Sequence, residues 1–89
     1  HDALPILAQQ MLVSRTRMYA KIKAITGQTP NDFFITLRLK KAAFLLRNNP
    51  ELNVTQIYDQ TGFSSPRYFS KLFKKAYQLT PMAYRQGEE

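Results

Sequence analysis

A long run without glycine or proline most constrains how this chain can fold. It spans Phe33–Asn48, and its apolar residues recur with the period of an α-helix. One stripe occupies every third or fourth position and consists of Ile35, Leu39, Ala42 and Leu46. Phe34, Ala43 and Leu45 widen the stripe beyond what a helix packed on one side requires. We therefore expect a long central helix that is contacted from two directions.

Positive charge is concentrated around this run. The 89 residues include 13 Lys and Arg against 6 Asp and Glu, which gives a formal net charge of +7. Between Ser14 and Arg47, eight cations face only Asp32. Such an excess favours a polyanionic partner, although a solvated basic surface produces the same composition. A chain of this length suits one small domain or two small lobes of marginal stability.

The composition also limits the chemistry that is available. Cysteine is absent, which excludes disulfides and thiolate metal sites, and the single histidine is His1. No pair of acid, base or nucleophile emerges, so we expect no enzyme activity, catalytic residue, metal or cofactor. No apolar run could span a membrane and no signal peptide is visible. We predict that this part of the protein lies in the cytoplasm and has no membrane partner. Because the sequence begins without Met, we expect it to belong to a longer chain.

Helix-capping residues divide the region before the central helix. They predict one helix at Leu4–Met11, a brief connection at Leu12–Val13 and a second helix at Arg15–Ile25. Ser14 suits the N-cap of the second helix, and Gly27 suits its C-cap because glycine tolerates the left-handed conformation. This region should therefore hold two short helices rather than one long helix.

The central helix and the region after it carry further start and stop signals. Thr29 and Pro30 suit the start of the central helix, and Asn48-Asn49-Pro50 stops it. Two further helices are expected, at Val54–Thr61 and Pro66–Tyr77, followed by a last short turn that begins at Thr80-Pro81 and runs through Tyr84. Their capping residues would be Asn53 with Gln56, then Ser64 or Ser65, and Thr80, with Gly62 as a stop. No stretch alternates with a strand period, so we predict an all-α fold.

The flanks of the central helix repeat one pattern about fifty residues apart. Leu7–Ser14 matches Ile57–Ser64, and after one extra residue Met18 pairs with Phe69 and Ile22 pairs with Phe73. A short helix, a tight turn and a second helix with a basic outer face form a helix-turn-helix pattern. One copy is weak evidence, because many helical hairpins bind nothing, but two copies favour DNA binding. Two such units could place their second helices in successive major grooves, about 34 Å apart.

Two segments carry a resemblance to a known family, SRTRMYAKIKAITGQTPNDFFITLRLKKAAFLL and VTQIYDQTGFSSPRYFSKLFKKAYQLTPMAYR. Together they resemble the DNA-binding domain of AraC/XylS family transcription regulators over nearly the whole chain. GFSSPRYFSKLFKK and LTPMAYR are among the most diagnostic stretches of that family. The first half is similar to the C-terminal output domains of Bacteroides-type hybrid two-component sensor-regulators.

The resemblance implies an architecture and a set of partners. Two helix-turn-helix lobes, residues 1–30 and 50–89, would be joined by a central linker helix at 31–49. In the family the N-terminal lobe has a further first helix, which would lie ahead of Leu4, and we expect it to be absent from this sequence. The implied partners are double-stranded DNA, upstream signalling domains of the same chain, and RNA polymerase.

Carried over position by position, the resemblance assigns roles along two recognition helices. The base-reading residues would be Thr16, Arg17, Arg67 and Lys71, since Arg or Lys to guanine is the commonest specific contact. Further recognition-helix positions are Arg15, Tyr19, Ala20, Ser65, Pro66 and Ser70. The phosphate contacts would come from Ser14, Lys21, Lys23, Ser64, Lys74 and Lys75. Tyr19, Tyr68 and Phe69 read better as core or rim residues, and Arg85 is as suited to capping a helix end as to binding.

Several residues depart from the family pattern. Ala20 stands where members often carry Arg, so the first recognition helix would either read fewer bases or use DNA shape and a methyl contact instead. Gln78 and Leu12 stand where turns usually have Gly, which predicts strained turns. Tyr58 replaces a small residue and would open a helix crossing. With its first helix missing, the N-terminal lobe would expose apolar surface and be the less stable lobe.

Two other classes of function fit some of these features. A protein-interaction module would use the broad apolar stripe to dock an upstream domain or a polymerase subunit. A membrane-surface helix would use the basic residues, although these are spread over several short capped helices. Salt separates DNA binding from docking, because DNA affinity falls steeply with ionic strength and an apolar interface barely responds.

Overall fold

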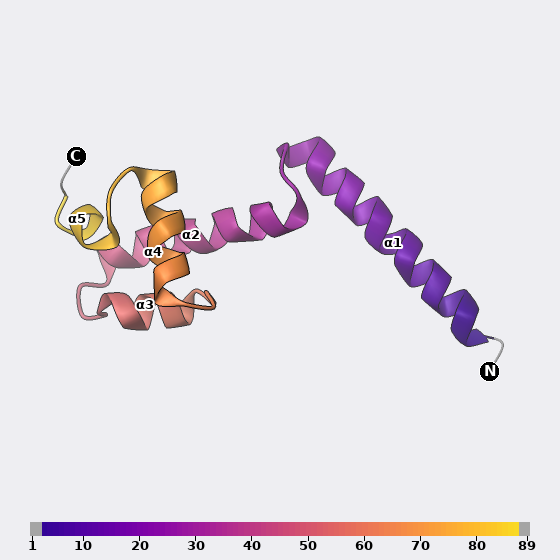
Figure 1. Ribbon diagram of the computed structural model, residues 1–89, viewed down its shortest axis with the longest axis horizontal. Helices are drawn as coiled ribbons and strands as arrows, with labels where there is room; N and C mark the ends of the chain where they lie inside the picture. Colours follow the sequence, from indigo (N-terminus) through magenta and orange to yellow (C-terminus); the bar gives the residue numbers. More distant parts are fainter. Residues whose placement is uncertain (1–2, 88–89) are drawn as a thin grey trace. The chain divides into compact units, whose positions relative to one another are not determined.

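The computed structural model describes residues 3–87, with side chains described from Ala8 onward, and this part of the chain consists of helices joined by short turns. The helices in this part are α1 (Ala3–Thr26), α2 (Pro30–Asn48), α3 (Val54–Gln60), α4 (Pro66–Tyr77) and α5 (Pro81–Arg85) (Figure 1). No strand occurs among the described residues, so the predicted all-α class is confirmed. His1 lies outside them. The chain divides into two compact units, His1–Phe34 and Ile35–Glu89.

The first unit contains one long helix where two were expected. α1 runs without interruption for 24 residues, so the turn predicted at Leu12–Val13 and the N-cap predicted at Ser14 are wrong. Nothing there forces a break, because Leu12 disfavours the left-handed conformation and no proline follows Ser14. The Thr16 hydroxyl donates to the Leu12 carbonyl at 2.9 Å, across the expected turn. The helix ends as predicted at Gly27, whose φ is +74°.

α2 forms where the central helix was predicted. Thr29 acts as its N-cap, because the Thr29 hydroxyl accepts from the Asp32 amide at 3.2 Å, and Pro30 is the first helical residue. The helix ends at Asn48, whose side-chain amide donates to the Phe44 carbonyl at 2.9 Å. We expected this helix to be contacted from two directions, and that expectation stays a prediction.

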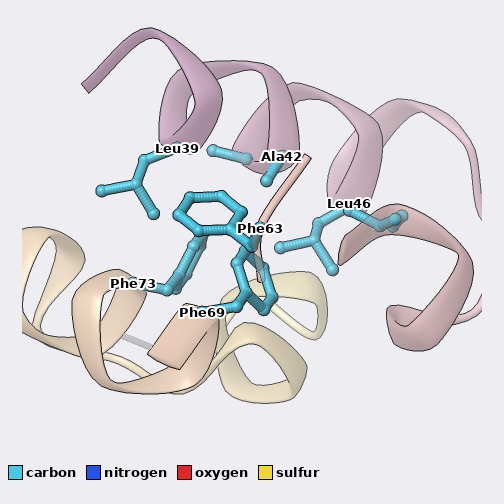
Figure 2. Packing of buried hydrophobic residues seen from close by; sticks show 8 residues of the cluster. Leu39, Ala42, Leu46, Phe63, Phe69 and Phe73 are labelled. Carbon is cyan, nitrogen blue, oxygen red and sulfur yellow. The ribbon is translucent and has the colours of Figure 1, made fainter. Parts of the chain in front are cut away.

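The core of the second unit lies between α2 and the helices that follow it. Its buried apolar residues are Leu39, Ala42, Ala43, Leu46, Ile57, Phe63, Phe69 and Phe73 (Figure 2). The predicted stripe of α2 is therefore confirmed, with Ile35 and Leu45 partly buried against the core. Phe34, which was expected to widen the stripe, is exposed. Full burial of each large apolar side chain contributes roughly 1.5–3 kcal/mol to the free energy of folding, so these residues stabilise the second unit.

Local caps set the helix starts in the second unit. Asn53 and Gln56 form a complete capping box at α3, as predicted. The Ser65 hydroxyl accepts from the Tyr68 amide at 3.1 Å and caps α4, and the Thr80 hydroxyl accepts from the Ala83 amide at 3.1 Å and caps α5. The turn between α3 and α4 contains Gly62 at φ +81°. Each cap fixes where a helix begins, which explains why these bounds follow from the sequence.

The turn after α4 is strained, as expected. Gln78 adopts φ +64°, a left-handed conformation that side chains with a Cβ disfavour. Its side-chain amide donates to the Lys75 carbonyl at 2.8 Å, which partly offsets the strain. Leu12, the other residue that stands where the family usually has Gly, lies within α1 and forms no turn.

Two arginines join the ends of α2 and α5. Arg85 donates from Nε to the Leu46 carbonyl at 3.0 Å and from Nη2 to the Asn49 carbonyl at 3.2 Å. Arg85 therefore caps the C-terminal end of α2, which was one of its two proposed roles. The guanidinium carbon of Arg47 lies 3.8 Å from the centre of the Tyr84 ring. In the described residues, no helix is both long and apolar enough to cross a bilayer.

Candidate nucleic-acid interface

The second unit contains a complete helix-turn-helix, formed by α3, the turn at residues 61–65 and α4. Thr61 is buried at the end of α3, and its hydroxyl donates to the Ile57 and Tyr58 carbonyls at 2.9 and 3.1 Å. Gly62 then turns the chain with a positive φ. Pro66 follows the Ser65 cap at the first position of α4. The predicted helix-turn-helix after the central helix is therefore present in full.

α4 has one buried face and one exposed basic face. Phe69 and Phe73 are buried in the core. The opposite side has exposed residues spaced three and four apart, Arg67, Ser70, Lys71 and Lys74. This spacing places them on one face of the helix. We call these four residues the α4 basic face.

Aromatic packing fixes the orientation of this face. The Phe69 ring centre lies 5.1 Å from that of Phe63 and 6.4 Å from that of Tyr58. The Phe73 ring stacks on Tyr77 at 4.7 Å and meets Tyr84 edge-on at 5.4 Å. Tyr58 thus packs its ring against the helix that it was expected to push away. The opened crossing itself stays a prediction.

The N-terminal end of α4 offers polar groups beside the basic face. Ser64 is exposed and Ser65 is half-buried, and the first turn of α4 contains no acidic residue. The free amides of a helix N-terminus carry a partial positive charge that favours anions. Tyr68 is exposed with its ring centre 6.3 Å from Phe63, so it lies at the rim and not in the core. Arg, Lys, hydroxyl and amide donors therefore meet at one end of this helix.

The charges of the α4 basic face are not compensated by any carboxylate in the described part of the chain. Among the described residues, no carboxylate pairs with Arg67, Lys71 or Lys74. The groups with shifted pKa values belong to the scaffold instead. Burial raises the pKa of Tyr77, and the hydrogen bond from Asn49 lowers the pKa of Glu51. The basic face is therefore available to an external polyanion.

The candidate residues of the first unit all lie exposed on α1. They are Arg15, Thr16, Arg17, Tyr19, Ala20, Lys21 and Lys23. Arg17 and Lys21 share a face, as do Thr16, Ala20 and Lys23, because each set is spaced three or four residues apart. Ser14 lies within the helix, so it lacks the free terminal amides on which its phosphate role depended. The first unit thus presents cations without a helix-turn-helix around them.

Apolar residues on α1 are exposed beside these cations. Met11, Leu12, Met18 and Ile25 are exposed, and Ile22 is only half-buried. This confirms the expected exposure of apolar surface before the central helix. The expectation that the N-terminal lobe is less stable than the C-terminal lobe stays a prediction.

Two features of the second unit were not predicted from the sequence. The Nε of Arg38 lies beside the α3–α4 turn, 3.7 Å from where a Cβ on Gly62 would stand. Phe44 and Leu37 are exposed on the side of α2 away from the core. The helical period of α2 already placed Phe44 opposite the buried stripe, so this second feature was detectable. The contact of Arg38 with the turn depends on tertiary packing and left no local signal.

The described part of the chain offers no cation-binding cluster beside the basic surface. Within residues 3–87, the structure contains no group of three or more His, Cys, Asp or Glu side chains that could hold a metal ion.

Comparison with known proteins places the chain among helix-turn-helix sequences. The family model described as "Helix-turn-helix domain" matches residues 7–87. A Formosa agariphila protein named "Histidine kinase P4" is 50% identical over 78 residues, covering 88% of this chain and 6% of that protein. The "HTH-type transcriptional activator RhaS" of an Escherichia coli strain is 37% identical over 83 residues, covering 93% of this chain and 30% of RhaS. The chain therefore spans less than a third of either relative. No solved structure matches it.

Proposed function

Because this chain belongs to the AraC/XylS family of helix-turn-helix DNA-binding domains, we propose that it reads specific double-stranded DNA sequences through α4 and α1. Family membership supports the general role of a DNA-binding domain in a transcription regulator. Our proposal is that the domain recognises specific sequences, and it names the residues that do so. The observation that carries it is the α4 basic face, which lies opposite the buried Phe69 and Phe73 and has no carboxylate partner among the described residues.

In this proposal α4 lies in a major groove. Arg67 and Lys71, one turn apart near the N-terminal end, reach base edges, and each well-aligned contact discriminates by about 1–3 kcal/mol. Ser70 and Pro66 line the same edge. Lys74, Lys75 and the Ser64–Ser65 end of the helix hold phosphates. The separation into reading and holding residues follows from their positions, because the N-terminal part of a recognition helix lies deepest in the groove.

α1 supplies the second contact. Thr16 and Arg17 read bases, with Arg15, Tyr19 and Ala20 beside them, and Lys21 and Lys23 contact phosphates. The Thr16 hydroxyl donates to Leu12 and so keeps its acceptor lone pairs for a base or phosphate. If each helix occupies its own groove, the two contacts would be about 34 Å apart along the DNA.

The relatives suggest the setting in which this domain works. One is named a histidine kinase and the other a transcriptional activator, and this chain matches only a part of each. We propose that upstream signalling domains of a two-component system control the domain, that it acts in the cytoplasm, and that RNA polymerase is a partner. No catalytic role is assigned to the chain itself.

Sequence selection from randomised duplex DNA at two salt concentrations tests the proposal. We expect enrichment of a bipartite site with half-elements about one helical turn apart, and affinity that falls steeply with salt. Arg67→Ala and Lys71→Ala should relax the preference at particular base pairs. Lys74→Ala is the matched control on the same face and should weaken all sequences alike.

The same selection also identifies a wrong assignment. If all three variants weaken DNA binding equally and leave the sequence preference unchanged, Arg67 and Lys71 do not contact bases. Salt-independent binding, or no binding, would favour a protein-docking role over DNA recognition.

A further inference from the structure

The outer side of α2 in the second unit has two large apolar side chains that remain exposed. Leu37 is 44% exposed and Phe44 is 62% exposed. They are seven positions apart, which places them on one helix face about two turns from each other. Leu39, Ala42 and Leu46 are buried on the other side of the same helix. Leu37 and Phe44 therefore face away from the core.

Cations lie on the same outer side as these two residues. Lys40 and Lys41 stand between Leu37 and Phe44 and are exposed. α2 has no acidic residue after Asp32, and within the described residues no carboxylate pairs with either lysine. We call Leu37, Lys40, Lys41 and Phe44 the α2 outer surface. It combines an apolar seam with positive flanks.

We propose that the α2 outer surface docks an acidic amphipathic helix of a partner protein. Apolar residues seven apart form the seam along which two helices pack. Carboxylates beside the partner's own apolar seam would meet Lys40 and Lys41. A second copy of this chain fits poorly, because the lysines of two α2 helices packed on this face would oppose each other.

The α2 outer surface and the α4 basic face lie on opposite sides of the core. Leu39, Ala42 and Leu46 project from α2 toward the rings of Phe63, Phe69 and Phe73, with α4 beyond them (Figure 2). By helical period, Arg67 and Lys71 lie on the side of α4 opposite the buried Phe69 and Phe73. Leu37 and Phe44 lie on the side of α2 opposite its buried residues. A helix docked on α2 therefore leaves the α4 basic face open. This inference does not depend on DNA binding, and its test is separate.

Binding of two synthetic helices by the whole chain tests the proposal. One probe peptide has leucines seven apart flanked by glutamates, and the matched peptide has lysines in place of the glutamates. We expect the glutamate peptide to bind at least about tenfold more tightly than the lysine peptide. Phe44→Gln should weaken the glutamate peptide about tenfold, because it removes the largest apolar contact.

The matched control is Met82→Gln, which replaces another exposed apolar residue of the same unit, 51% exposed on α5. It should leave peptide binding unchanged, and circular dichroism should show that both variants keep their helices. Equal binding of the two peptides, no binding of the glutamate peptide, or no loss in Phe44→Gln would overturn the proposal. So would displacement of the peptide by duplex DNA, or a dimer in sedimentation equilibrium that Phe44→Gln dissolves, since these assign the surface to DNA or to a second copy.

Discussion

The two copies of the internal repeat have similar sequence patterns and different structures. Residues 57–77 form a helix, a turn and a capped second helix, whereas residues 7–26 form part of one uninterrupted helix. The paired positions Met18 and Phe69 show the difference most clearly, since Met18 is 53% exposed and Phe69 is 1% exposed. Matching spacing is therefore not sufficient for a helix-turn-helix. The hairpin also needs a break in the helix and a core on which to close.

The break in the second copy has two local causes that the first copy lacks. Gly62 takes a positive φ, and Leu12 stands at the corresponding position of the first copy. Pro66 follows the Ser65 cap and cannot continue a helix from α3, whereas Arg15 follows Ser14. Serine alone does not stop a helix when glycine and proline are missing around it.

Removing the core at paired positions should give the largest difference between the copies. Phe69→Ala should cost the second unit about 3–5 kcal/mol, because it leaves a cavity among packed aromatic rings. Met18→Ala should change stability by less than about 0.5 kcal/mol, since the side chain is largely exposed. Urea unfolding followed by tyrosine fluorescence measures both. Equal losses would mean that the first copy has a core of its own.

Exchanging the turn residues tests the cause of the break. Gly62→Ala should cost about 1–2 kcal/mol, because alanine must then adopt a left-handed conformation. Leu12→Ala should be neutral or slightly stabilising, since alanine is the best helix former. Thermal unfolding monitored by circular dichroism compares the two variants. A cost at Leu12 as large as that at Gly62 would contradict a continuous α1.

The paired serines give a smaller contrast with opposite signs. Ser65→Ala removes the acceptor of the Tyr68 amide and should cost about 1 kcal/mol. Ser14→Ala lies within α1 and should raise helix stability by about 0.5 kcal/mol at most. Urea midpoints report the first and helix content by circular dichroism reports the second. If Ser14→Ala loses as much as Ser65→Ala, Ser14 is a cap after all.

The smallest expected effect is at Gln78, the one non-glycine residue between 3 and 87 that is left-handed. Gln78→Gly should stabilise the second unit by about 0.5–1 kcal/mol, because glycine adopts φ +64° without strain. The lost bond from the Gln78 amide to Lys75 reduces this gain. Gln28→Gly, after the C-cap of α1, is a control in the first unit and should not stabilise the chain. A lower melting temperature for Gln78→Gly would show that the side-chain bond outweighs the strain.

Local signals predicted most of the second unit from the sequence. The Asn53 capping box, the Ser65-Pro66 pair and the Thr80-Pro81 pair each act within one helical turn, so reading them needs no tertiary structure. The apolar stripe of α2 likewise follows from helical period alone. α1 was predicted wrongly because Ser14 suits an N-cap, but a serine with no glycine or proline beside it does not stop a helix. The roles of individual residues in binding DNA stay predictions.

Other features depend on long-range packing and left no pattern to read. Arg47 lies on the ring of Tyr84, 37 positions away, and Arg85 caps the end of α2 across a similar separation. Tyr68 was expected at the core or its rim and lies at the rim, while Phe69 beside it is in the core. Adjacent residues of a helix point in different directions, so Phe69 faces the core of the second unit and Tyr68 lies at its edge.

Backbone chemical shifts and amide exchange of the whole chain, measured by NMR, test the difference between the copies most directly. We predict helical shifts without a break from residue 8 to residue 26, with fast amide exchange along α1. We predict a break at Gly62 flanked by slowly exchanging amides, slowest at the buried Phe69 and Phe73 of α4. A second break at Leu12–Ser14 with slow exchange on both sides would contradict the account, because both copies would then be equally formed helix-turn-helix units.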